Sequence, residues 1–110
     1  MSLPDGDRAI VDVTKLRDYC LNPGHPVGKH KARVFASALG LTATDVALLH
    51  SALRMAAATG DAVAGRHLEH GQLYTVDFLM HVGAREAMVR SGWIIRRGEG
   101  VPRLTTCYVL

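Results

Sequence analysis

The sequence is short of cysteine and aromatic residues and has no long apolar run, and each shortage excludes a class of protein. Its 110 residues include two cysteines, one tryptophan and two phenylalanines. Cys20 and Cys107 form no C-x-x-C pair, so we expect reduced thiols, bridged only if the fold brings them together. No apolar stretch reaches the roughly 18 residues of a membrane-spanning helix, and no basic segment followed by an apolar one opens the chain. The sequence therefore predicts a cytoplasmic protein with no membrane contact.

Apolar residues are nevertheless abundant. They make up 48% of the chain, which favours a folded protein over a disordered one. The length is that of a single domain over residues 1–110, and we expect the polar residues 1–12 to form a partly disordered tail. Thirteen Lys and Arg residues exceed ten Asp and Glu residues, for a net charge of +3. Such a mildly basic chain suits a polyanionic partner but does not require one.

Hydrophobic spacing divides the chain into a helical first half and a strand-rich second half. Apolar residues first recur at the spacing of helix faces, and after Gly60 they alternate as in half-buried strands. The expected helices lie at residues 14–21, 28–39 and 42–60. The expected strands lie at residues 74–80, 87–96 and 104–110, with a weak edge strand at 62–66. The predicted fold is α+β, with three N-terminal helices packed on one face of a three- to four-stranded C-terminal antiparallel sheet.

The most suggestive segment is residues 25–33, His-Pro-Val-Gly-Lys-His-Lys-Ala-Arg, at the start of the second expected helix. It contains no acid, and its cations and histidines are Lys29, Lys31, Arg33, His25 and His30. Free N–H groups at a helix start attract phosphate, and nearby cations would stabilise the extra charge that phosphate gains during cleavage. The alternative is a solvated basic face of an amphipathic helix. The segment also lacks the spacing of a nucleotide-binding phosphate loop.

A second group of polar residues is expected on the sheet. Arg90 and Arg96 share one face of their strand, while Thr106 and Tyr108 lie on the last strand. If the helices cover the other face, these residues would line a basic groove. A metal-independent ribonuclease needs only an acid, a base and a cation around the phosphate, with the ribose 2′-hydroxyl as nucleophile. The alternative is that they are ordinary residues on a solvated sheet face.

Several segments together resemble a bacterial domain family of uncharacterised function. They are residues 21–35, from Leu-Asn-Pro-Gly to Arg-Val-Phe, residues 71–76, Ser91-Gly92-Trp93-Ile94, and residues 102–108. Members of that family are similar in layout to the barnase–EndoU–colicin–RelE group of ribonuclease toxins. The resemblance covers the chain from about residue 14 to its end. It implies that a lysine, Lys29 or Lys31, or a histidine acts as acid or base. It further implies that Arg90 holds phosphate and that Thr106 positions it, and Tyr108 is a further position that matches the family on the last strand.

We therefore expect a small bacterial toxin-like domain and hypothesise that it is a metal-independent ribonuclease acting on RNA. Its expected protein partner is a cognate antitoxin or immunity protein. One alternative is a noncatalytic interaction module, either an immunity or regulatory partner or a homodimer, which the apolar C-terminal strand favours. Another is nucleic-acid binding without catalysis. His67 and His70 lie three residues apart, but the glycines near them indicate a loop, so no metal and no cofactor is expected.

Overall fold

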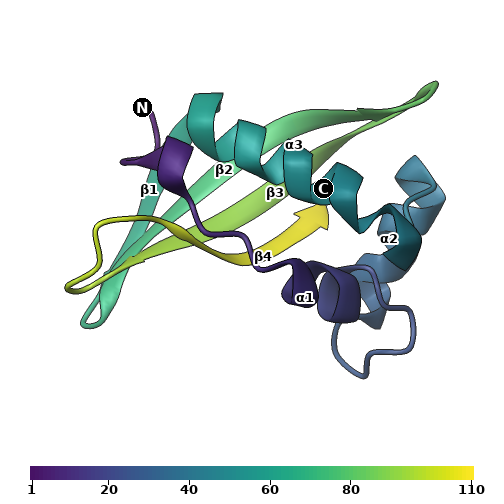
Figure 1. Ribbon diagram of the computed structural model, residues 1–110, viewed down its shortest axis with the longest axis horizontal. Coiled ribbons are helices and arrows are strands. Elements are labelled where there is room, and N and C mark those ends of the chain that lie inside the picture. Colours follow the sequence, from purple (N-terminus) through teal and green to yellow (C-terminus); the bar gives the residue numbers. More distant parts are fainter.

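The structure is a computed structural model that describes residues 1–110, and it places the helices before the sheet (Figure 1). In chain order, the helical elements are η1 Gly6–Arg8, α1 Val13–Lys15, η2 Leu16–Cys20, α2 Lys29–Leu39, η3 Ala43–Asp45 and α3 Val46–Thr59. The strands are β1 Ala62–Leu68, β2 Gly71–Val82, β3 Arg85–Arg96 and β4 Arg103–Val109. The predicted α+β order is therefore confirmed, and the antiparallel sheet has four strands.

The helices begin and end at residues suited to those positions. α2 ends at Gly40, whose φ of 69° lies in the left-handed region that glycine favours. Before α3, Thr42 and Asp45 form a capping box across η3. The first expected helix differs: Asp12 caps it by accepting from the Thr14 N–H at 2.9 Å, and a single α-helical turn then continues as the π-helical turn η2. No single helix is long and apolar enough to cross a membrane. Taken together, α2 and the η3–α3 segment would be long and apolar enough, but they are bent by 76° relative to each other.

The sheet is a simple antiparallel meander in the order β1-β2-β3-β4. β2 and β3 pair without interruption along their whole lengths, so they form its longest and most regular part. The register of β3 against β4 shifts directly after the Gly92–Thr106 pair, which leaves Thr105 as the extra residue of a bulge in β4. Because a bulge bends its strand locally, it changes the direction of the side chains on either side of it.

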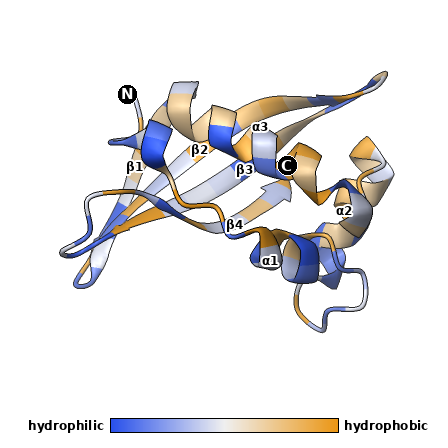
Figure 2. Cartoon of the chain, viewed as in Figure 1, coloured by the Kyte–Doolittle hydropathy of each residue, from blue (hydrophilic) through white to orange (hydrophobic).

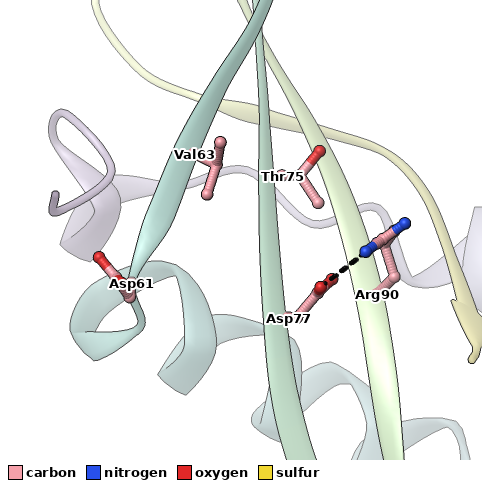
Figure 3. Close-up of a pocket in the computed structure, with 5 residues that line it drawn as sticks. All are labelled: Asp61, Val63, Thr75, Asp77 and Arg90. Carbon is pink, nitrogen blue, oxygen red and sulfur yellow. Dashed lines mark hydrogen bonds and ion pairs between the residues drawn. The ribbon is translucent and has the colours of Figure 1, made fainter.

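One face of the sheet is buried beneath the helices. Val76, Val89 and Trp93 are fully buried there, within a core cluster of 20 residues. The buried Ser91 hydroxyl donates to the Val76 carbonyl at 2.7 Å and accepts from Trp93 Nε1 at 2.9 Å, so each polar group in this part of the core has a partner. α3 lies across this face (Figure 1), and Figure 2 shows hydrophobic residues along α3 and the strands beneath it. The opposite face carries no helix over β1, β2 and β3 (Figure 3).

The segment of residues 1–12, expected as a partly disordered tail, packs along α3 and the start of β4. Leu3, Ala9 and Val11 are buried in the core cluster. Ile10 forms two backbone hydrogen bonds with the residues that flank the first residue of β4, at 2.9 and 3.0 Å. The expectation of a tail came from the polar residues, but these alternate with buried apolar ones that anchor the segment.

Candidate functional site

Lys31, in the first turn of α2, extends its side chain to β4. Its Nζ donates to Thr106 Oγ1 at 2.9 Å and lies 5.4 Å from the ring centroids of both Tyr19 and Tyr108. Thr106 and Tyr108 are two residues apart on one strand, so their side chains lie on the same face of the sheet. An ammonium within about 6 Å of an aromatic face is attracted to it, so two rings and a hydroxyl fix this cation in place. We call Tyr19, Lys31, Thr106 and Tyr108 the Lys31 cluster.

The loop before α2 packs against Tyr19. The His25 ring lies edge-on to the Tyr19 ring, with 4.7 Å between their centroids. His25 Nδ1 accepts the N–H groups of Val27 and Gly28 at 3.0 and 2.9 Å, so we assign the proton of the neutral ring to Nε2. Gly28 is so close to Tyr19 that a Cβ atom there would lie 2.3 Å from the Tyr19 carbonyl oxygen. The loop thereby holds the start of α2, and Lys31 with it, against η2.

Arg90, on β3, lies beside the Lys31 cluster on the helix-free face. Its Nε and Nη2 donate to the two carboxylate oxygens of Asp77, both at 2.8 Å (Figure 3), and its pairing partner on β4 is Tyr108. The hydrogen bond from Arg90 lowers the pKa of Asp77 below its usual value. The same bond, followed by the contact with the Tyr108 hydroxyl, raises the pKa of Arg90. Arg90 is therefore a permanent cation with two of its nitrogens already engaged.

Two hollows lie near Tyr108. One, of about 430 Å³, opens on the helix-free face and is lined by Asp61, Val63, Thr75, Asp77 and Arg90 (Figure 3). The other, of about 230 Å³, lies where α2 meets β4 and is lined by His30, Lys31, Val34, Tyr108 and Val109. The second hollow combines a fixed ammonium, a phenol and an exposed imidazole. It is the place in the structure where groups suited to acid–base chemistry and to anion binding meet.

The structure brings some of the predicted site residues together and leaves others apart. Those that meet are Lys31, Thr106, Tyr108 and Arg90, with His25 and His30 at the margin. Those that stand apart are Lys29, Arg33 and Arg96. Lys29 and Arg33 are on α2 but form no hydrogen bond or ion pair with the cluster. Arg96 is the last residue of β3, six positions beyond Arg90, and forms an ion pair with Glu99 at 3.7 Å.

Sequence reasoning did not identify Tyr19 and Asp77 as neighbours of the site. The helical spacing of Tyr19 indicates a core residue, and its contact with Lys31 depends on the loop that returns α2 to η2. Asp77 could have been found, because counting outward from the tight turn at Gly83 places it opposite Arg90. The register of the β2–β3 hairpin would therefore have predicted the pairing of Asp77 with Arg90.

Two free thiols are buried directly beneath the cluster. Cys20 follows Tyr19 in η2, and Cys107 lies between Thr106 and Tyr108 on β4; both are fully buried. The fold brings the thiols together, and the hydrogen bond between them lowers the pKa of Cys20 and raises that of Cys107. The thiol pair therefore joins the same two elements that hold the Lys31 ammonium.

The histidines considered as a metal pair lie apart from this site. His67 is on β1, where its Nδ1 lies 2.9 Å from Gln72 Oε1, and His70 is in the turn that follows. Gln72 Nε2 also donates to the Gly65 carbonyl at 2.9 Å, so the His67 side chain is part of the β1–β2 hairpin. No group of three or more His, Cys, Asp or Glu side chains in the chain could hold a metal ion.

Comparisons with known proteins give one family and one fold. Residues 2–110 match a family described as a domain of unknown function, DUF6883. A chain of the contact-dependent growth inhibition toxin–immunity protein complex from Klebsiella pneumoniae 342 is similar in structure, with a TM-score of 0.66 and 12% sequence identity over 96% of each chain. At that identity the likeness concerns the fold alone. No curated protein matches the sequence.

Proposed function

This chain belongs to the DUF6883 family, and from that premise we propose that it is a toxin-like domain that cleaves RNA without a metal ion. The observation that carries the proposal is the Lys31 cluster, in which segments far apart in sequence present a cation, a hydroxyl and two phenol rings at one edge of the sheet. The shared fold with a chain of a toxin–immunity complex supports the same class.

The proposed reaction uses the ribose 2′-oxygen as nucleophile. It bonds to phosphorus while the bond to the 5′-oxygen breaks, which leaves a 2′,3′-cyclic phosphate and a 5′-hydroxyl. Lys31 and Thr106 hold the nonbridging phosphate oxygens, and Arg90 approaches them through Nη1, the nitrogen that Asp77 leaves free. The charge that develops on phosphate thus meets two fixed cations.

His30 is the proposed proton carrier. It takes the proton of the 2′-hydroxyl and supplies one to the departing 5′-oxygen, because it is exposed and lines the same hollow as Lys31. His25 is less suited to this role. Its Nδ1 already accepts two backbone N–H groups, so a ring that donates its Nε2 proton would become an imidazolate.

The test is cleavage of single-stranded RNA by the purified protein in the presence of EDTA, with the ends of the products identified. We expect cyclic phosphate ends, no cleavage of the corresponding DNA, and losses of about a hundredfold or more in Lys31→Met and His30→Ala. Arg8→Ala, a charge removal at the exposed η1, is the matched control and should cleave normally. If the folded protein leaves RNA intact and its expression does not slow growth, the proposal is wrong.

A second candidate function is that of an immunity or regulatory module. It is favoured by the structurally similar chain, which comes from a complex of a toxin with its immunity protein. It is also favoured by the exposed apolar side chains of Val63, Leu79 and Met88, which lie on β1, β2 and β3. Expression separates the two candidates, because a toxin arrests growth whereas an immunity module is harmless and protects against a toxin. A homodimer, the remaining form of this candidate, predicts a doubled mass by size-exclusion chromatography with light scattering.

A further inference from the structure

A third hollow, separate from the Lys31 site, lies beside the first residues of β4. It measures about 240 Å³ and is lined by Ile10, Asp12, Lys15, Ile94, Arg96, Arg103, Leu104 and Thr105. We call it the Arg103 hollow. Its walls come from the N-terminal segment, α1, β3 and β4, and the Ile10 hydrogen bonds join the N-terminal segment to β4. Three of its residues are cations.

Two carboxylates lie near these cations, Asp12 in the lining of the hollow and Glu99 outside it, and they leave some of the cations' N–H donors unused. Glu99 is shared by two arginines, with 3.3 Å to Arg103 Nη2 and 3.7 Å to Arg96 Nη1. Asp12 accepts the Thr14 N–H as the cap of α1. Lys15 has no ion-pair partner, and Arg103 Nε is buried without a hydrogen-bond partner in the protein. A buried N–H of a charged group without an acceptor is unfavourable, and a phosphate oxygen is an acceptor that guanidinium groups bind well.

The Arg103 hollow adjoins the Lys31 site along β4. Thr105 lines the hollow and Thr106 bonds Lys31, and these two are the adjacent residues at the bulge. Arg103 and Thr106 are three residue steps apart along the strand, which is at most about 10 Å. On β3, Gly92 places no side chain between the two sites. A Cβ atom there would lie 3.0 Å from Thr105 Oγ1 and 3.2 Å from Thr106 Cγ2.

We propose that the Arg103 hollow binds a second phosphate of the same nucleic-acid strand, next to the phosphate at Lys31. The substrate class is then an RNA strand with phosphates beyond the one that is cleaved, rather than a dinucleotide. This inference rests on the proposed function for the Lys31 site. Lys15, Arg103 and the hydroxyl of Thr105 are the groups that hold the second phosphate.

The first test compares substrates of different length. The double variant Lys15→Ala/Arg103→Ala should lower kcat/KM roughly tenfold for an oligoribonucleotide, since a hydrogen bond to a charged group is lost. It should leave cleavage of a dinucleoside monophosphate, which has one phosphate, within about twofold. Arg8→Ala is again the matched control, and thermal unfolding verifies that each variant is folded. Equal losses on both substrates would overturn the proposal.

The second test does not require cleavage. Binding of a noncleavable 2′-O-methyl RNA oligonucleotide is measured as a function of salt, where the slope of log K against log salt is about −0.7 per phosphate neutralised on a single strand. We expect the double variant to reduce this slope in magnitude by about 0.7 or more, and Arg103→Lys to restore part of the affinity. An unchanged slope would overturn the proposal. A reduced slope in a protein that cleaves no RNA would support the second phosphate site while refuting the nuclease.

Discussion

Replacement of Lys31 by methionine separates the structural part of the Lys31 cluster from any catalytic part. Methionine keeps a long apolar stem but removes the ammonium, so it eliminates the Thr106 hydrogen bond and both aromatic contacts. A hydrogen bond to a charged group contributes about 1.5 kcal/mol at the lower end, and each half-exposed cation–π contact about 0.5 kcal/mol. Removal of all three contacts should therefore lower the free energy of unfolding by about 2.5 kcal/mol.

The measurement is urea unfolding of the purified variants. For a chain of this size a loss of about 2.5 kcal/mol lowers the urea midpoint by roughly 1 to 1.5 M at an unchanged m-value. Lys29→Met is the matched control, because Lys29 is on the same helical turn without a hydrogen bond or ion pair, and it should change stability by less than about 0.5 kcal/mol. A double-mutant cycle with Thr106→Val should give a coupling energy of about 1 kcal/mol. Equal effects of the two lysine variants, or a coupling energy of zero, would refute the described geometry.

Three further predictions concern other parts of the fold. Asp77→Asn should lower stability slightly at pH 7, because it removes the ion pair with Arg90. Folding lowers the pKa of this exposed carboxyl, so the stability difference between the variant and the unmodified protein should disappear as pH falls below 3.8, which thermal unfolding at a series of pH values would show. Ser91→Ala should cost about 2–3 kcal/mol in urea unfolding, since Trp93 Nε1 loses its only acceptor in the core. Gly6→Ala should cost about 1–3 kcal/mol, because its Cβ atom would collide with the Ala57 carbonyl oxygen.

Each of the three predictions has an outcome that would contradict it. A stability difference between Asp77→Asn and the unmodified protein that persists at pH 2 would show that the ion pair is not its cause. Ser91→Ala with unchanged stability would mean that the indole N–H has another acceptor. For Gly6→Ala the control is Gly100→Ala, which meets no atom within 4 Å. If both glycine variants unfold alike, the N-terminal segment does not pack on α3 as described.

The order of helices and strands could be predicted because the spacing of apolar residues follows which side chains each element buries. The switch in spacing after Gly60 corresponds to the end of α3 at Thr59 and the start of β1 at Ala62. The weak edge strand at 62–66 is the edge strand β1, whose register against β2 shifts between Ala64 and His67, and its exposed residues explain why its pattern was faint. The first helix was predicted less well, since the choice between α and π turns depends on what the turn packs against.

The candidate site was only half accessible from the sequence. Lys31, Thr106 and Tyr108 could be named because unusual clusters of cations and of Thr and Tyr residues mark their segments. That Lys31 rather than Lys29 reaches β4 depends on the angle between α2 and the sheet, which no local pattern contains. The ion pair of Arg90 with Asp77 restricts two of the nitrogens that the sequence suggested were free.

The pairing of Ile10 with the start of β4 has a consequence for the kinetics of folding. β1, β2 and β3 follow one another through short turns and can assemble from neighbouring residues. The Ile10–Arg103 bridge instead joins positions 93 residues apart, so it must form against a large loss of chain entropy. We expect this contact to form after the transition state. Destabilising substitutions around Ile10 should then accelerate unfolding and leave the refolding rate almost unchanged.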